Sequence, residues 1–375
     1  ASAVIVNKFF RHIGVCRKDS IMKKNLFTIT ALAAATALSF GSLNLVCAAE
    51  TEDTSSDKKL NVMASFYPMY DFAVKVGGDK VEVTNMVPAG TEPHDWEPAA
   101  TDIKNLEDAD VFIYNGAGME HWTEDVLDSL ENKDLKVVEA SEGLTLLEGK
   151  EEEEETDDAD SSSESSSDED TSDENSSADS SSDSEASADS TSEDDSSDSE
   201  IVYDPHVWLS PVNAKTEMEN IKNAFVEADP DNKDYYEQNY ETYAEKFDQL
   251  DQEYKDGLSD TKSKDLITSH EAFGYLCQEY GLNQVGIEGL SPDSEPDASR
   301  MDEIIKFAKE NNVKTIFFEE LVSPKVSETI ADEIGAKTAV LNPIEGLTDD
   351  EISAGEDYFS VMETNLKTLE DALNE

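Results

Sequence analysis

Cysteine is rare in this sequence. Its 375 residues include three, Cys16, Cys47 and Cys277. The first two precede the region with the pattern of a folded domain, so Cys277 stands alone there and no disulfide can form within that region. We expect Cys277 to be a small buried apolar residue on a helix.

Basic residues are also scarce. The chain has 28 Lys and Arg against 87 Asp and Glu, a formal net charge of -59. Such a balance argues against nucleic acid or an anionic membrane surface as a partner. Much of the charge lies in residues 149–200, which are nearly all Ser, Asp, Glu, Thr and Ala. This stretch has too little apolar surface to offset its chain entropy, and we expect a disordered loop inserted in the first lobe.

The one long apolar run, residues 26–45, is interrupted by polar residues and follows the basic pair Lys23-Lys24. It indicates an export signal rather than a membrane span, so residues 1–49 are a leader whose true start fits Met22. The protein is then extracytoplasmic, at the cell surface or in the periplasm. Cys47 sits where a lipoprotein carries its lipid anchor, but the preceding Leu45-Val46 lacks the usual small residue. Lipidation stays open, and residues 50–58 are expected to be a tether.

From residue 59 onward, strand patterns alternate with helical ones, which is typical of parallel βαβ units. The sequence predicts an α/β fold of two lobes with mostly parallel sheets, joined by long helix. The lobes are residues 59–210 and 259–375, with a helical linker over 211–258. Strands are expected at 60–66, 80–87, 111–115, 135–139, 265–269, 284–287, 315–318 and 338–341. Helices are expected at 68–76, 101–109, 120–130, 211–227, 234–258, 272–280, 300–310, 324–334 and 350–373.

Histidine is limited to five residues, yet three of them occupy similar settings. His94 lies in EPHDWEP (92–98), His206 in DPHVWLSP (204–211), and His270 in TSHEAF directly after a predicted strand. Neutral imidazole is the commonest metal ligand in proteins, and ligands collect beyond the carboxyl ends of parallel strands. Three such ligands and one carboxylate suit a divalent metal such as zinc, held between the lobes.

The fourth ligand should be an acid from the second lobe. Glu319 and Glu320 follow one predicted strand, and Glu345 in LNPIEGL (341–347) follows the next. Periodicity cannot choose among them, because all three lie at strand ends. The remaining histidine of the folded region, His121, is expected on the surface of a helix.

These four segments, in this order, resemble the zinc-binding, cluster A-I family of solute-binding proteins for ABC transporters. The resemblance covers residue 60 to the C-terminus apart from the acidic stretch. It implies two lobes with the metal between them and the ligands His94, His206, His270 and Glu345. It also implies Zn2+ rather than manganese, because manganese-binding relatives carry a carboxylate where this chain has His270. The acidic stretch departs from the family pattern, since zinc-specific members often have histidine there.

The resemblance implies a monomeric protein that captures zinc outside the cell and delivers it to a membrane permease of an ABC transporter, without enzymatic activity. Two alternatives remain. A zinc-dependent hydrolase would need an open coordination position and a general base, for which Glu271 beside His270 is the nearest candidate. A surface metal-binding adhesin is the other, because some relatives are described as binding host matrix proteins.

Overall fold

The computed structural model describes residues 58–149, 202–292 and 296–375. The predicted leader, Cys47, the tether before Lys58 and the acidic stretch from residue 150 lie outside the described residues. Contacts divide the chain after Ser55, and every described residue belongs to the compact unit Ser56–Glu375. Within the described ranges, no helix has the length and apolar character needed to cross a membrane.

The N-terminal lobe is built on a parallel sheet of four strands in the order β2-β1-β3-β4. The strands are β1 (Leu60–Ala64), β2 (Val81–Asn85), β3 (Val111–Tyr114) and β4 (Lys136–Glu139). The central strands β1 and β3 are almost continuously apolar and buried, as strands covered on both faces must be. Helices α1 (Tyr67–Gly77), α2 (Ala100–Glu107) and α3 (Thr123–Ser129) connect them.

The C-terminal lobe repeats this arrangement, with a parallel sheet in the order β6-β5-β7-β8. Its strands are β5 (Asp265–Thr268), β6 (Asn283–Gly286), β7 (Thr315–Phe318) and β8 (Lys337–Val340). Its helices include α6 (Gly274–Tyr280), α7 (Ala298–Glu310) and α8 (Lys325–Ile334). Cys277 lies buried on α6 as expected.

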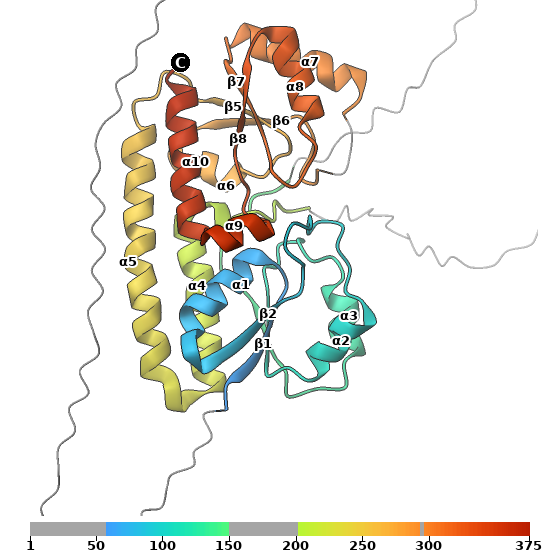
Figure 1. Cartoon of the computed structure of the whole chain (residues 1–375), viewed down its shortest axis with the longest axis vertical. Helices are drawn as coiled ribbons and strands as arrows, with labels where there is room; N and C mark the ends of the chain where they lie inside the picture. Colours follow the sequence, from blue (N-terminus) through green and yellow to red (C-terminus); the bar gives the residue numbers. More distant parts are fainter. Residues whose placement is uncertain (1–57, 150–201, 293–295) are drawn as a thin grey trace, which may run out of the picture. The chain divides into compact units, whose positions relative to one another are not determined.

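Two long helices follow the N-terminal sheet and lead to the second one (Figure 1). Helix α4 (Pro211–Ala228) has Pro at its first position and Ser210 as its cap, and α5 (Lys233–Leu258) follows after a short 3-10 turn. An aromatic cluster joins α1, α5 and the last helix, since the rings of Phe72, Phe247 and Tyr358 pack mainly edge to face. The predicted α/β architecture of two lobes is therefore confirmed.

The predicted terminal helix over 350–373 is wrong in one respect, because it is two helices, α9 (Asp349–Ala354) and α10 (Tyr358–Leu373). Gly355 adopts a left-handed φ of 87° and ends α9. Asp357 then caps α10 by accepting a hydrogen bond from the Ser360 N–H. Helix α9 has no buried residue, so no change in an apolar face marks where it ends, and Gly355 is the sequence signal of the break.

The two described ends of the acidic insertion meet at one point. Glu148 and Tyr203 form an isolated antiparallel bridge, and the Gly149 N–H donates to the Val202 carbonyl at 2.8 Å. The insertion therefore leaves and re-enters the fold at the same place, which allows it to vary without moving the strands.

Candidate metal centre

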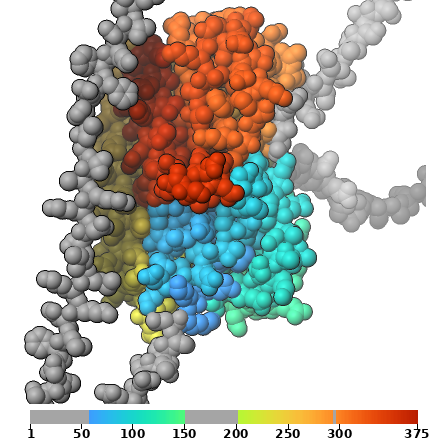
Figure 2. Space-filling model, viewed as in Figure 1, coloured from blue at the N-terminus to red at the C-terminus, as the bar shows by residue number. Residues whose placement is uncertain are grey.

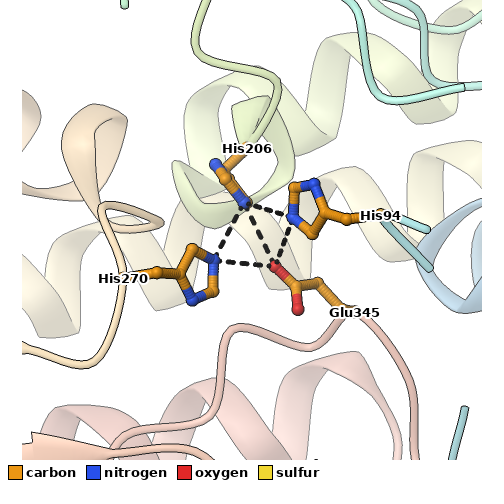
Figure 3. A group of neighbouring side chains, drawn as sticks. All are labelled: His94, His206, His270 and Glu345. Atoms are coloured by element: carbon orange, nitrogen blue, oxygen red, sulfur yellow. Dashed lines mark hydrogen bonds and ion pairs between the residues drawn. The ribbon is translucent and has the colours of Figure 1, made fainter. Parts of the chain in front are cut away.

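Four side chains from four separate loops converge on one point (Figure 3). His94 lies in the loop after β2, and His206 stands just before the 3-10 turn Val207–Leu209. His270 follows β5, and Glu345 follows β8. Each lobe thus contributes side chains beyond the carboxyl ends of its strands, where ligands of parallel sheets are expected.

The spacing of the four groups suits one small cation. The Nε2 atoms of His94, His206 and His270 lie 3.3, 3.1 and 3.2 Å from Glu345 Oε1. The Nε2 of His206 is 3.2 Å from that of His94 and 3.2 Å from that of His270. Ligands at about 2.0 Å from a tetrahedral zinc are separated by about 3.3 Å. These five separations are close to the edge length of a zinc tetrahedron, and the sixth, between the ligand atoms of His94 and His270, is within 4.8 Å.

The centre is almost completely enclosed. His206 and His270 have no exposed surface, Glu345 is 1% exposed, and the His94 side chain retains 10%. On the face shown in Figure 2, the red-orange residues of α9 lie against the blue residues of the N-terminal lobe. His94 is the ligand candidate nearest to solvent.

Two further carboxylates orient two of the imidazoles. Asp204 Oδ1 lies 2.8 Å from His206 Nδ1, and Glu319 Oε1 lies 2.7 Å from His270 Nδ1. Each carboxylate can accept only from a protonated Nδ1, so it favours the tautomer whose Nε2 lone pair faces the other ligands. The sequence predicts Glu319 as an alternative ligand, but its contact with His270 Nδ1 places it outside the group of four.

Glu320 takes a different position again. It accepts a hydrogen bond from the side chain of Asn342, at the start of the loop that carries Glu345. His121 is exposed as predicted, 52% by side chain, with Glu97 as a neighbour at 3.8 Å, but it lies in the turn before α3 and not on a helix. The orienting role of Asp204 was missed, although its place two residues before His206 is a visible signal.

The charges of the centre are strongly coupled. Burial disfavours the imidazolium of His270, but Glu319 and Glu345 outweigh it and hold the His270 pKa well above its usual value. Burial alone would raise the pKa of Glu345, yet the imidazoles around it, His270 first, hold that pKa well below its usual value. The pKa of His94 is lowered by burial. Without a metal, Glu319 and Glu345 therefore favour the protonated form of His270.

Hydrogen bonds outside the ligand group join the loops of the two lobes. The Trp208 indole N–H donates to the Pro343 carbonyl at 2.7 Å, and the Gly90 N–H donates to the Leu347 carbonyl at 3.0 Å. The loops of His206 and His94 are thus each tied to the loop of Glu345, so the two halves of the site are held in register.

Comparison with known proteins shows that the chain is similar to zinc-binding proteins. Residues 62–372 match the family described as zinc-uptake complex component A, periplasmic. The chain is 42% identical to the high-affinity zinc uptake system protein ZnuA of Bacillus subtilis, over 85% of this chain and 89% of that protein. It is 41% identical to the zinc-binding lipoprotein AdcA of Streptococcus pneumoniae, over 84% of this chain and 56% of that longer protein. The crystal structure of the Zn(II)-bound ZnuA-like domain of AdcA superposes with a TM-score of 0.66 at 38% identity, covering 85% of this chain and all of that domain.

Proposed function

The chain belongs to the family of zinc-uptake complex component A, and from this premise we propose that it captures Zn2+ outside the cytoplasm through His94, His206, His270 and Glu345 and delivers it to the permease of an ABC transporter. The observation that carries the proposal is the convergence of these four enclosed ligand atoms, all within 4.8 Å of one another. Zinc is the cargo of the site, held for transfer.

The ligand set favours zinc over harder cations. Three imidazole nitrogens and one carboxylate oxygen suit zinc, whereas manganese and magnesium prefer more oxygen ligands. The relatives named for zinc uptake and the Zn(II)-bound structure of the AdcA domain support the same choice.

The enclosure of the site favours holding zinc over zinc chemistry. A catalytic zinc keeps one coordination position for water, whereas four protein ligands close the shell. In a hydrolase Glu345 would have to leave the metal and admit water, and its contacts with all three imidazoles argue against that. We therefore propose transport binding in preference to hydrolysis.

The setting proposed for this capture is the outer side of a membrane. The leader predicted for residues 1–49 and the periplasmic and lipoprotein relatives support export, and Cys47 is the candidate anchor. Labelling with a lipid precursor, compared between the natural chain and Cys47→Ala, tests the anchor.

Calorimetric titration with Zn2+ and with Mn2+ tests the metal assignment on the chain from residue 50 onward. We expect tight one-to-one zinc binding, much weaker manganese binding, and loss of tight binding in His270→Ala. His121→Ala is the matched control, because His121 is exposed and should leave binding unchanged. Tight manganese binding with weak zinc binding would contradict the metal assignment.

The same titration on a chain lacking residues 150–201 separates the centre from the acidic insertion. The short Gly149–Val202 contact makes this deletion feasible. An unchanged tight site would place capture in the four-ligand group, and additional weak zinc sites lost with the deletion would give the insertion a collecting role. Delivery is tested by growth under zinc chelation, where the natural chain but not His270→Ala should restore uptake in cells lacking their own binding protein.

A further inference from the structure

The loop that carries Glu345 is hydrogen-bonded at nearly every residue. The Leu341 N–H donates to the Phe318 carbonyl, and the Pro343 and Leu347 carbonyls accept the interlobe bonds from Trp208 and Gly90. Such a network fixes the backbone on both sides of Glu345. The carboxylate is therefore presented by a loop that has little freedom to adapt to the metal.

The residue before Glu345 is in a conformation that its side chain resists. Ile344 has a φ of 59°, in the left-handed region, which β-branched residues rarely adopt. Its side chain is fully buried, and its N–H donates to Asn342 Oδ1 at 2.7 Å. This backbone geometry can persist only where surrounding contacts hold it, and it turns the next residue toward the metal centre.

The contact that holds Asn342 comes from a distant helix. Asn365, on α10 and 2% exposed, accepts a hydrogen bond from the Asn342 N–H at 3.0 Å. Its Nδ2 donates back to the Asn342 carbonyl at 2.7 Å. The Asn365 amide thus pairs both backbone polar groups of Asn342. The Asn342 side chain in turn accepts the hydrogen bond that holds the turn at Ile344.

Helix α10 also reaches the loop of a second ligand. The Tyr358 hydroxyl, in its first turn, donates to the Trp208 carbonyl at 2.6 Å, two residues after His206. The Trp208 indole in turn bonds the Pro343 carbonyl. Asn365 and Tyr358 therefore connect one helix to the loops of Glu345 and His206.

We propose that Asn365 is a positioning residue for the fourth ligand: through Asn342 it holds the left-handed turn at Ile344 that aims the Glu345 carboxylate at the zinc. This inference rests on the proposed ligand role of Glu345. Asn365 itself does not touch the metal centre. A residue that only pairs buried backbone groups would affect stability alone. Removal of Asn365 should instead lower zinc affinity, and it should do so only while Glu345 is present.

A double-mutant cycle tests this role. Zinc affinity is measured by competition with a chelating dye for the natural chain, Asn365→Leu, Glu345→Ala and the double variant. We expect Asn365→Leu to weaken zinc binding about tenfold. This is the lower end of the loss seen when a residue that supports a metal ligand, without touching the metal, is removed. In the Glu345→Ala background the same change should weaken binding less than twofold, since no fourth ligand remains to be aimed.

The matched control is Asn239→Leu. Asn239 lies on α5 and donates its side-chain Nδ2 to the Val76 carbonyl at 2.9 Å, away from the ligand loops. It should lower the melting temperature of the metal-free protein without changing zinc affinity. The visible spectrum of bound Co2+ gives a second readout, and we expect it to change in Asn365→Leu but not in Asn239→Leu. If Asn365→Leu does not fold, Asn365→Ser, a smaller polar side chain that cannot make both hydrogen bonds at once, replaces it in the cycle.

The outcomes are distinct. Equal losses of affinity from Asn365→Leu with and without Glu345, or an unchanged Co2+ spectrum, would overturn the positioning role while leaving the zinc site intact. A natural chain that binds no zinc, or a Glu345→Ala variant that binds it unchanged, would instead overturn the proposed ligand set and the inference with it.

Discussion

The two acid-Pro-His segments of the molecule, 92–94 and 204–206, share one hydrogen bond but orient their histidine rings differently. In both, the acidic side chain accepts a hydrogen bond from the backbone N–H of its histidine. Asp204 also reaches the Nδ1 of the His206 ring, whereas the described contacts of the His94 ring are made through Nε2. His206 and His270 are therefore buried and oriented by carboxylates, while His94 is oriented less firmly and lies nearest to solvent. The comparison separates two histidines that carboxylates orient from one whose ring has no such contact among those described.

The largest effect should come from removing an oriented ligand. In His270→Ala, Glu319 and Glu345 remain buried without the imidazole between them, and we expect zinc affinity to fall on the order of a hundredfold or more, about a quarter of the binding free energy of a four-ligand zinc site. His94→Ala should cost about tenfold less, because water from the solvent side can take the fourth position. Competition titration with a zinc chelator measures both. Equal losses of zinc affinity in His270→Ala and His94→Ala would show that orientation by a carboxylate does not contribute to binding.

The next effect should come from the orienting carboxylates. Asp204→Asn and Glu319→Gln keep the shape of the side chain but remove the charge that favours Nδ1–H on His206 and His270. We expect each to weaken zinc binding by about 10- to 100-fold. Asp229→Asn is the matched control, since Asp229 accepts bonds from Tyr236 and Asn232 far from the centre. An affinity unchanged in both site variants would show that packing alone orients the rings.

The fold and most of the site could be predicted from the sequence, for a physical reason. Alternating strand and helix patterns are local signals, and ligands at the ends of parallel strands follow from that alternation. The separate roles of Glu319, Glu320 and Glu345 could not be obtained this way, because all three follow strands and differ only in where their loops turn. The left-handed turn at Ile344 aims Glu345, and it depends on Asn342 and the distant Asn365, a contact that no local pattern encodes. The break between α9 and α10 does not follow from periodicity either, because α9 buries no residue and Gly355 is the signal that separates the two helices.

The number of protons released on zinc binding should also distinguish His270 from His94, through a smaller change in zinc affinity than removal of a ligand causes. Because the His270 pKa is raised, we expect the metal-free centre to hold a proton to higher pH than a free imidazole does, and zinc must displace that proton. Affinity should therefore fall as the pH falls, by at least tenfold per pH unit below the raised pKa. His94, whose pKa is lowered, should contribute no proton at neutral pH. Calorimetry in buffers of different ionisation enthalpy counts the protons, and we expect at least one per zinc for the natural chain and for His94→Ala, but fewer for His270→Ala.

The stability of the metal-free protein should show the opposite trend with pH. His270 has a folded pKa above its unfolded value, so its protonation stabilises the fold fully below about pH 6.5 and this contribution is lost as the pH rises through the folded pKa. Zinc replaces the proton, so the melting temperature of the loaded protein should stay constant over the same range. A metal-free melting temperature that rises across that range would contradict the assignment of the proton.

The smallest effect concerns a buried acid that orients nothing. Glu217, on α4, has no exposed surface, and among the described residues neither of its carboxylate oxygens has a hydrogen-bond partner. Burial first, and then Glu120, raises the Glu217 pKa well above its usual value. Its contribution to folding is therefore most favourable below about pH 4.3 and is lost as the pH rises toward the folded pKa. Glu217→Met removes both oxygens, and we expect it to raise the melting temperature by a few degrees at pH 8, about 1 kcal/mol or more, and by less at pH 4. Zinc affinity should not change, in contrast to Asp204→Asn and Glu319→Gln, whose carboxylates face ligand rings. If Glu217→Met instead weakens zinc binding, Glu217 contributes to the metal centre, and the distinction between carboxylates that orient ligands and those that are only buried in the core is wrong.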